Sequence, residues 1–469
     1  MTSNLTIRNL TLNHVELKLL ERFESAAQLE SDGLGGFANI SNITKTFSGL
    51  LNNVTGPSSP EIAAKSESFS HEEVSISIEP FETKGTDIQT TNKEVLRLTF
   101  EVEGQRYRVD TPSPSERSAV LTALSPDPQF QFTAVYLPNH SFLALYSSAK
   151  LDSWMSRLKD ETPLSALSIP GTHNSPTCHT ALPSVRCQAV GVREQLNNGV
   201  RFLDIRVQPE DAEDHTKEGL ILVHSAFPIS LTGNKYFRDL QNTVVEFLDA
   251  NPSETVIISL KREGLGKSSD QHFSKVLHTH YTHDESRWFT ENRIPALGEA
   301  RKKIVLIRRF NQDESLNGLN NGRGLGIDAA SWPDNCADGA CSSGEIRVQD
   351  FYEVGESQNI EKKIKLSTDQ LGRAAEIICA LENEAPKQPF FVNFLSASNF
   401  WSPNCWPDRV AAKINPSVIE HLCKDHNFGE GKTVGDGSTG IVVCDWVGNN
   451  GDWDLVRCIV GMNARLQTR

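Results

Sequence analysis

Residues 167–175 read Leu-Ser-Ile-Pro-Gly-Thr-His-Asn-Ser, a short apolar run that ends at His173. Two similar runs follow: Gly-Val-Arg-Phe-Leu-Asp-Ile-Arg at 199–206 and Leu-Ile-Leu-Val-His-Ser at 220–225. Each run carries charged or titratable side chains at its carboxyl end, and a parallel β/α barrel builds its active site at that end of its strands. The sequence therefore predicts an enzyme with its site at one rim of a barrel.

The second part of the chain alternates apolar runs with helical patterns, which indicates parallel βαβ units. Segments 236–249 and 371–381 have apolar residues at helical intervals. Eight runs are predicted as strands: 166–172, 200–207, 220–225, 255–262, 303–309, 346–351, 390–396 and 440–446. Eight is the number that a closed barrel needs, so we predict an α/β fold with a distorted (β/α)8 TIM-type barrel over residues 150–469.

The first 149 residues have a different pattern. Segments such as 74–78 and 96–102 alternate apolar and polar residues, which is typical of antiparallel strands. Residues 31–70 are rich in Gly, Ser, Asn and Pro and are predicted to be a flexible loop. We expect a smaller antiparallel β-sandwich at 1–149, whose simplest role is a scaffold, with lipid, protein or regulatory contacts left open.

Composition limits the partners and the compartment. The formal net charge of −14 over 469 residues disfavours nucleic acid and strongly anionic membranes, so an anionic substrate needs a local cationic pocket. No apolar stretch reaches the roughly 18 residues of a membrane span, and no signal peptide is recognised, which predicts a soluble protein, cytoplasmic or peripheral at a membrane. Asn-x-Ser/Thr triplets in the first part leave secretion as the alternative. Cys178/Cys187 and Cys336/Cys341 can form loop disulfides if the compartment is oxidising.

The runs that end near His173, Arg206 and His224 resemble the catalytic X region of phosphatidylinositol-specific phospholipase C, in its single-domain bacterial form. The resemblance covers roughly residues 150–469 and implies a TIM-barrel enzyme that releases diacylglycerol and inositol 1,2-cyclic phosphate. Further matching segments follow in the same order: Ser259–Glu263, Val305–Arg309, Val348–Tyr352 and Gly440–Asp445.

The resemblance implies a role for each catalytic candidate. It makes His173 the base for the inositol 2-hydroxyl, His224 the acid for the diacylglycerol oxygen and Arg206 the cation at the phosphate. Imidazole suits both proton transfers because its ordinary pKa is about 6.5. Asp445, after the last strand, is expected to orient His173. Asp204 shares a strand face with Arg206 and either accepts from a substrate hydroxyl or holds the guanidinium.

Further strand-end residues are expected to contact the inositol ring, which needs many directional donors and acceptors. Strand parity does not decide between Arg308 and Arg309, so Arg309 is chosen from the family pattern. Tyr352 can also stack on the apolar face of the ring. Ordinary strand-end ion pairs are the alternative for the whole set: Lys261, Glu263, Arg309, Asp350 and Tyr352.

The question of a metal cofactor is addressed by comparing this sequence with the calcium-binding pattern of the broader family. Animal enzymes of the broader group hold calcium with an Asn beside the first histidine and with acidic residues on the second and fourth strands. Asn174 fits this pattern, but Arg206 and Lys261 stand where carboxylates would lie. We therefore expect no metal cofactor, with Ca²⁺ as the alternative. Asn174 also replaces the Asp that assists the acid histidine in bacterial enzymes, so the partner of His224 is left open.

The segment 399–406, Asn-Phe-Trp-Ser-Pro-Asn-Cys-Trp, follows the seventh run and carries three aromatic residues. These rings either cap the barrel core or enter the headgroup region of a bilayer. The expected partners are phosphatidylinositol or a related phospholipid and a transient membrane surface. Two other functions stay open: a phosphodiesterase for another phospholipid or for glycosylated phosphatidylinositol, and a catalytically weak lipid- or glycan-binding protein.

Overall fold

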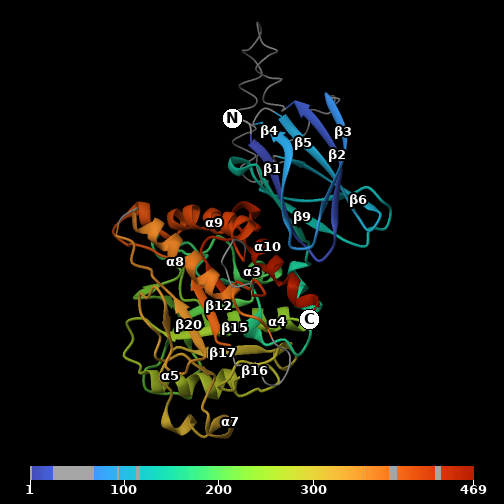
Figure 1. The fold of residues 1–469 in the computed structure, drawn as a ribbon. Coiled ribbons are helices and arrows are strands. Elements are labelled where there is room, and N and C mark those ends of the chain that lie inside the picture. The colour runs from blue at the N-terminus through green and yellow to red at the C-terminus, as the bar shows by residue number, and fades with distance from the viewer. Residues whose placement is uncertain are drawn as a thin grey trace. The chain divides into compact units, whose positions relative to one another are not determined.

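The structure is a computed structural model in which two compact units are visible (Figure 1). One comprises residues 1–148 with 450–454, and the other comprises 149–449 with 455–469. Most of the loop predicted at 31–70 lies outside the described residues, which are 3–24, 68–91, 94–111, 117–355, 358–379, 388–427 and 435–468.

The first unit consists of two five-stranded sheets. One sheet has the order β4-β1-β10-β9-β7, with β4 Thr83–Thr90, β1 Ser3–Leu10, β10 Phe142–Ser147, β9 Phe132–Leu137 and β7 Ser118–Val120. The other has the order β3-β2-β5-β6-β8, with β3 Ser70–Ile78, β2 Val15–Glu24, β5 Glu94–Val102, β6 Gln105–Thr111 and β8 Thr122–Ala123.

Both sheets contribute to one hydrophobic core. Leu5 and Leu145 of the first sheet belong to the same buried cluster as Leu17 and Phe100 of the second. The alternation that predicted strands thus places every second side chain in this core. One detail of the prediction is wrong: β1 and β10 run parallel, so the unit is not wholly antiparallel.

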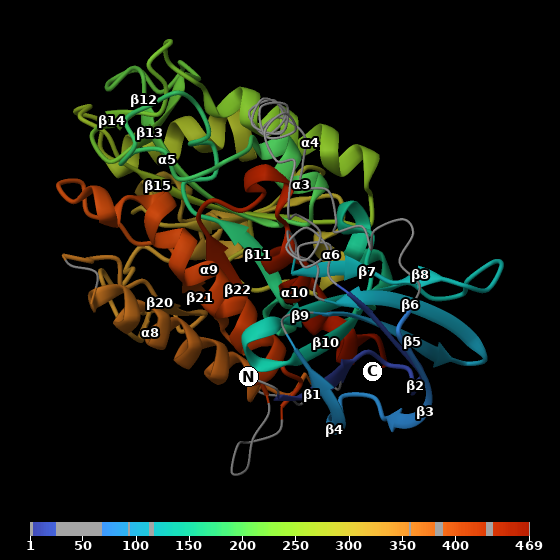
Figure 2. The same ribbon diagram turned by 90° about the horizontal axis from the view of Figure 1, so that it is seen from above.

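The second unit is built on a curled sheet of mainly parallel strands in the order β16-β17-β15-β12-β11-β22-β21-β20-β19. Figure 2 shows β20, β21, β22 and β11 following one another across this sheet. Its strands are β11 Ile169–Thr172, β12 Phe202–Pro209, β15 Val256–Arg262, β16 Trp288–Phe289, β17 Ile304–Arg308, β19 Gly339–Ala340, β20 Ile346–Gln349, β21 Phe390–Phe394 and β22 Ile441–Cys444.

Helices connect the strands. The prediction at 236–249 corresponds to α4, and the apolar positions that gave its period are buried. The prediction at 371–381 is wrong in its bounds, because α8 ends at Ala375. The helices are α3 Val192–Asn197, α4 Phe237–Ala250, α5 Asp270–Leu277, α6 Leu297–Ala300, α7 Leu319–Gly322, α8 Gln358–Ala375, α9 Pro407–Lys424 and α10 Asp454–Gly461. Among the described residues, no helix is long and apolar enough to cross a bilayer.

Two predictions for the barrel are wrong. The predicted strand at 220–225 is β13 Leu220–His224, which runs antiparallel to β12 and forms a hairpin with β14 Phe227–Pro228. The short strand β18 Ile327–Asp328 instead continues the parallel sheet beside β17. No pairing joins β18 to β20 in the described strands, so the sheet is open rather than closed.

The predicted loop disulfides are not formed. Cys178 and Cys187 are free thiols, and so are Cys336 and Cys341.

Candidate active site

The strand ends around β11 bring the first catalytic candidates together. β11 ends directly before His173 and pairs with β12 on one side and β22 on the other. Gly171 permits this close approach, because a Cβ there would lie 2.9 Å from Cδ1 of Phe202 on β12. β22 ends directly before Asp445, so His173 and Asp445 extend from neighbouring strands.

His173 lies between a carboxylate and an amide. Its Nδ1 is 2.9 Å from Oδ1 of Asp445, and its Nε2 is 3.0 Å from Nδ2 of Asn174. Burial disfavours the imidazolium, but Asp445 and then Cys187 outweigh burial and raise the pKa of His173 well above its usual value. A proton on Nδ1, donated to Asp445, leaves the lone pair on Nε2, where the Asn174 amide donates, as the candidate base.

His224 ends the hairpin strand β13 and has different partners. Its Nδ1 is 2.8 Å from the Val185 carbonyl oxygen and 3.9 Å from Sγ of Cys187. A carbonyl can only accept, so Nδ1 carries the proton and Nε2 is left for a substrate. Burial lowers the pKa of His224, but Cys187 raises it and the net shift is upward. The partner of His224, which the sequence left open, is therefore the backbone carbonyl of Val185.

The two imidazoles are close neighbours. The centroids of the His173 and His224 rings are 5.9 Å apart, and the ring planes are nearly perpendicular. With hydrogen bonds of about 2.6–3.2 Å, both rings can reach one phosphate group. The geometry therefore permits one ring to remove a proton while the other delivers one.

The backbone turns sharply after each of these functional groups. The residues that follow the two histidines and the strand-end aspartate have left-handed backbone conformations, with φ of 40° at Asn174, 52° at Ser225 and 52° at Trp446. Non-glycine residues seldom adopt this region, and such positions concentrate at functional sites. Each turn leaves the preceding side chain at the strand end.

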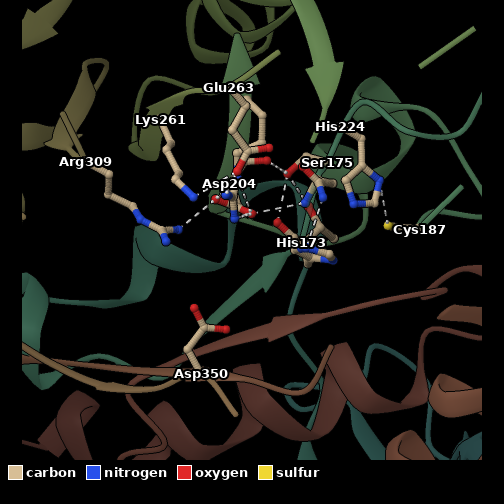
Figure 3. Close-up of polar contacts among 12 residues, drawn as sticks. His173, Ser175, Cys187, Asp204, His224, Lys261, Glu263, Arg309 and Asp350 are labelled. Atoms are coloured by element: carbon tan, nitrogen blue, oxygen red, sulfur yellow. Dashed lines mark hydrogen bonds and ion pairs between the residues drawn. The ribbon is translucent and has the colours of Figure 1, made fainter. Parts of the chain in front are cut away.

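Next to the histidines lies a cation cluster, defined as Asp204, Arg206, Lys261, Glu263 and Arg309. Figure 3 shows four of these residues, Asp204, Lys261, Glu263 and Arg309. Arg206 and Lys261 are register partners on β12 and β15. Nη2 of Arg206 is 2.9 Å from Asp204, and its Nη1 is 2.6 Å from Glu263. Nζ of Lys261 is 3.0 Å from Glu263, and Nη1 of Arg309 is 3.4 Å from Asp204. Asp204 thus holds two arginines, and its second predicted role, accepting from a substrate hydroxyl, stays a prediction.

The cation cluster keeps an excess of positive charge. Burial favours the neutral carboxyl groups, but the pKa values of Asp204 and Glu263 are held below their usual range, chiefly by Arg206. Burial and then Arg206 lower the pKa of Arg309 to about 10, so it stays charged at neutral pH. Three cations and two carboxylates (3 − 2) leave a net charge of +1 in a chain of formal charge −14.

The donor set at the calcium position does not fit that ion. Calcium needs six to eight oxygen ligands. The carboxylates of Asp204 and Glu263 are already bonded to guanidinium and ammonium groups, and Arg206 contacts both. No step of the reaction is therefore assigned to calcium.

The outer candidates are placed less uniformly. Asp350 accepts a hydrogen bond of 2.9 Å from Nε1 of Trp332 and lies apart from the cation cluster in Figure 3. The hydroxyl of Tyr352 is 3.1 Å from Asp334. Burial and then this carboxylate raise the pKa of Tyr352 to about 12. The hydroxyl and backbone N–H of Tyr352 contact the 334–335 loop, and its carbonyl accepts from the backbone N–H of Ser398.

Of the two adjacent arginines, Arg309, which was chosen from the family pattern, is the one that lies in the cation cluster. Arg308 pairs with Asp328 at 3.0 Å, away from the cation cluster. Arg309 contacts Asp204, and its Cζ lies 3.7 Å from the centroid of the Trp332 ring. This stacking fixes the plane of the guanidinium.

Sequence reasoning missed three contributors. Gln188 donates through Nε2 to the His173 carbonyl at 2.7 Å and lies 3.5 Å from Asp445. Cys187 was considered only as a disulfide partner, and Trp332 was not considered. All three lie in loops, where no periodic pattern marks a residue. A cysteine between two histidine runs was the one available signal.

A pocket of about 410 Å³ opens beside His224. Its lining includes Val185, Phe227, Phe400 and Trp401. The rings of Phe227 and Phe400 stack at 5.5 Å, whereas Trp401 is 86% exposed. The exposure of Trp401 excludes the reading in which this ring caps the barrel core.

The match to a known family covers this site. Residues 161–310 match the family model described as phosphatidylinositol-specific phospholipase C, X domain. This segment of the chain is similar to the X domain. The resemblance found in the sequence is confirmed. The matched residues include both histidines and the cation cluster, while Asp350, Tyr352 and Asp445 lie beyond them.

The chain is also similar to curated proteins and to solved structures whose names contain the same activity. A Staphylococcus aureus protein named 1-phosphatidylinositol phosphodiesterase is 26% identical over 327 residues, 66% of this chain and 94% of its own length. A Listeria monocytogenes protein of the same name is 33% identical over 170 residues, 34% of this chain and 50% of its length. A structure of pentafluoro-Phe-substituted phosphatidylinositol-specific phospholipase C from S. aureus has a TM-score of 0.52 at 22% identity, covering 67% of this chain and 97% of that one. The last likeness shows the fold.

Proposed function

We propose that this chain is a phosphatidylinositol-specific phospholipase C that releases diacylglycerol and inositol 1,2-cyclic phosphate. The observation that carries the proposal is the pair of imidazoles, His173 with Asp445 behind it and His224 with its ring centroid 5.9 Å away, beside a cation cluster. The names of the relatives, 1-phosphatidylinositol phosphodiesterases, support the same reaction.

The reaction needs two proton transfers and one displacement. His173 takes the proton of the inositol 2-hydroxyl at Nε2, and the resulting oxygen attacks phosphorus. The bond from phosphorus to the glycerol oxygen breaks, and His224 gives its Nε2 proton to that oxygen. Asn174, which contacts Nε2 of His173, must yield this position to the substrate hydroxyl. The imidazolium of His173 is stabilised by Asp445.

The phosphate is bound by cations of the chain, and catalysis proceeds without a metal. The net charge of +1 in the cation cluster suits a phosphodiester monoanion, and preorganised donors stabilise the charge that develops on phosphorus. Lys261 has the more accessible side chain, 38% exposed, whereas that of Arg206 is 9% exposed. Lys261 therefore orients the headgroup, and the buried guanidinium groups of Arg206 and Arg309 supply positive charge behind it.

The loops that follow the strands are proposed to touch the membrane. Large apolar side chains are exposed on four of these loops: Leu182, Leu231, Leu265 and the pair Phe400 and Trp401. Because the catalytic residues extend from the same strand ends, this surface would bring the pocket beside His224 to the lipid headgroups.

The role of the first unit and the compartment are also proposals. The two sheets form a β-sandwich domain that acts as a scaffold. We place the protein in the cytoplasm or at the membrane periphery, with secretion as the alternative. The free thiols of the two candidate disulfides support a reducing compartment.

The test is hydrolysis of phosphatidylinositol vesicles by the full chain. His173→Ala and His224→Ala should each reduce the rate by about 10²–10⁴-fold, the usual contribution of a general base or acid. His215→Ala, which changes an exposed histidine, serves as the control and should retain the rate. Wild-type rates in either histidine variant would contradict the proposal.

A further inference from the structure

Three side chains of the active site form a cluster that the proposed reaction does not use as a unit. His173, Cys187 and His224 each offer one ligand atom, and these atoms lie within 4.8 Å of one another. Cys187 is buried on the loop between β11 and α3, and it serves neither as base nor as acid. Of the residues that the structure describes, this trio is the group with metal-ligating atoms so close together.

We propose that His173, Cys187 and His224 form a binding site for Zn²⁺ that inhibits the enzyme. Two imidazoles and one thiolate are a ligand set that Zn²⁺ prefers, and the thiolate disfavours calcium and magnesium. Three protein ligands with a fourth, open position are also the usual composition of an accessible zinc site.

The geometry requires only a small contraction. Zinc bonds of about 2.0–2.3 Å in a tetrahedron place the ligand atoms about 3.3–3.8 Å apart. The observed limit of 4.8 Å therefore means that the side chains must approach by about 1 Å. The pocket of about 410 Å³ lined by His224 provides a path for the ion and space for a water at the fourth position.

The surrounding groups are those that orient metal ligands. The Asp445 carboxylate holds Nδ1 of His173 at 2.9 Å, and the Val185 carbonyl holds Nδ1 of His224 at 2.8 Å. At His173 this acceptor fixes the tautomer that presents Nε2 to a metal. At His224 the ring nitrogen near the thiol is Nδ1, 3.9 Å from Sγ of Cys187, so coordination there replaces its contact with the Val185 carbonyl. The backbone N–H of Cys187 donates to Oγ1 of Thr177 at 3.1 Å, which fixes the position of the thiol.

Binding removes groups that the reaction needs. The ion occupies a lone pair on each imidazole, and the Cys187 thiol releases its proton to the buffer. With both imidazoles coordinated, neither can exchange a proton with the substrate. The inhibitory effect rests on the proposed phospholipase activity, whereas metal binding itself does not.

The test uses Co²⁺ as a spectroscopic probe and the purified full chain. Titration with Co²⁺ should produce the charge-transfer absorption of a thiolate–cobalt bond, and Zn²⁺ should abolish it by displacement. Cys187→Ser should lose this absorption. Cys178→Ser, which changes a free thiol on the same loop, is the matched control and should keep it. No absorption in the wild type, or an unchanged absorption in Cys187→Ser, would overturn the proposal.

A second variant and a second readout protect against a folding defect. His224→Gln should weaken Co²⁺ binding by at least about tenfold, since even loss of an outer hydrogen-bond partner costs this much. Zn²⁺ should raise the unfolding temperature of the wild type and of Cys178→Ser but not of either ligand variant. An equal rise in all four proteins would overturn the site.

Inhibition is measured separately on phosphatidylinositol vesicles. Zn²⁺ should reduce the wild-type rate reversibly, with recovery on adding chelator, and Cys187→Ser should resist this inhibition relative to its own metal-free rate. Equal zinc inhibition of both proteins would overturn the inhibitory role. If the wild type shows the cobalt absorption but no hydrolysis without metal, the proposed function fails while the metal site stands.

Discussion

The position of Asp445 decides how His173 works. Its Oδ1 lies 2.9 Å from Nδ1 of His173, and Nε2 of Gln188 lies 3.5 Å from the same oxygen. The carboxylate is buried, so its charge acts on the imidazole with little screening by water. In the proposed reaction, Asp445 therefore both selects the tautomer of His173 and stabilises its protonated form.

Removal of this charge should change the pH profile. The base works deprotonated, so activity falls as pH falls through the pKa of His173, which Asp445 raises. Asp445→Asn lowers that pKa, so the acid limb of the pH–rate profile should move to lower pH. The maximal rate should also fall by about 10²-fold or more, because the base is less well oriented.

The matched control for this pH experiment is Asp350→Asn. Asp350 is hydrogen bonded to Trp332 rather than to a histidine, so the acid limb should stay where it is in the wild type. An acid limb that moves equally in both variants, or in neither, would contradict the role given to Asp445.

At the site, the sequence pattern predicted functional residues on or directly after strands but missed those in loops. His173 and Asp445 directly follow β11 and β22, and Arg206 lies in the second half of β12, near the rim that fold geometry predicts. The partner of His224 is a backbone carbonyl, at Val185, and no side-chain pattern can reveal such a group. Cys187 comes into contact only because its loop folds back over the strand ends.

At the scale of elements, apolar runs indicated where strands lie but not which way each one runs. β13 is as apolar as its neighbours, yet it pairs antiparallel to β12 as part of a hairpin. β18 has only two residues, too few for any period to be seen. The count of eight was therefore reached with one wrong strand, and the closure inferred from it was wrong.

A buried ion pair joins the amino ends of β12 and β15. Arg201 directly precedes β12 and lies 2.8 Å from Glu254, and both side chains are fully buried. Arg201 also donates to carbonyls at Leu151 and Leu196, so its guanidinium is fully committed. Glu254→Ala would leave this cation buried without its counter-ion.

We expect Glu254→Ala to lower the free energy of unfolding by about 3–5 kcal/mol, the usual cost of breaking one side of a buried pair. Denaturant unfolding measures the loss. The control is Glu246→Ala, which breaks the exposed pair with Arg193 and should leave the free energy of unfolding nearly unchanged. An equal loss of unfolding free energy in both variants would contradict the view that burial makes the Arg201–Glu254 pair important for stability.

At the scale of the whole molecule, charge and apolar surface act in opposite directions. A formal charge of −14 repels anionic lipids, so attraction to a bilayer has to come from apolar contact. Among the described residues, Trp401 is the most exposed large apolar side chain, and it lines the pocket that contains His224. Membrane binding should therefore depend on this ring more than on ionic strength.

Trp401→Ala should weaken binding to phosphatidylinositol vesicles roughly tenfold, as expected for loss of a large apolar contact. Hydrolysis of soluble inositol 1,2-cyclic phosphate should be spared, because Trp401 has no role in the proton transfers. Vesicle sedimentation and the soluble assay measure the two effects. Ile378→Ala is the control, because this exposed side chain lies before β21, at the other end of the sheet. Equal loss in both assays would argue against an interfacial role.

The central claim is that two imidazoles act on one phosphorus without a metal. Phosphorus resonance of phosphatidylinositol vesicles treated with the full chain in excess chelator tests this claim most directly. The account predicts a signal of inositol 1,2-cyclic phosphate that appears at the undiminished rate and is absent with His173→Ala. A product that forms only after calcium is restored, or an acyclic phosphate formed without a cyclic intermediate, would contradict it.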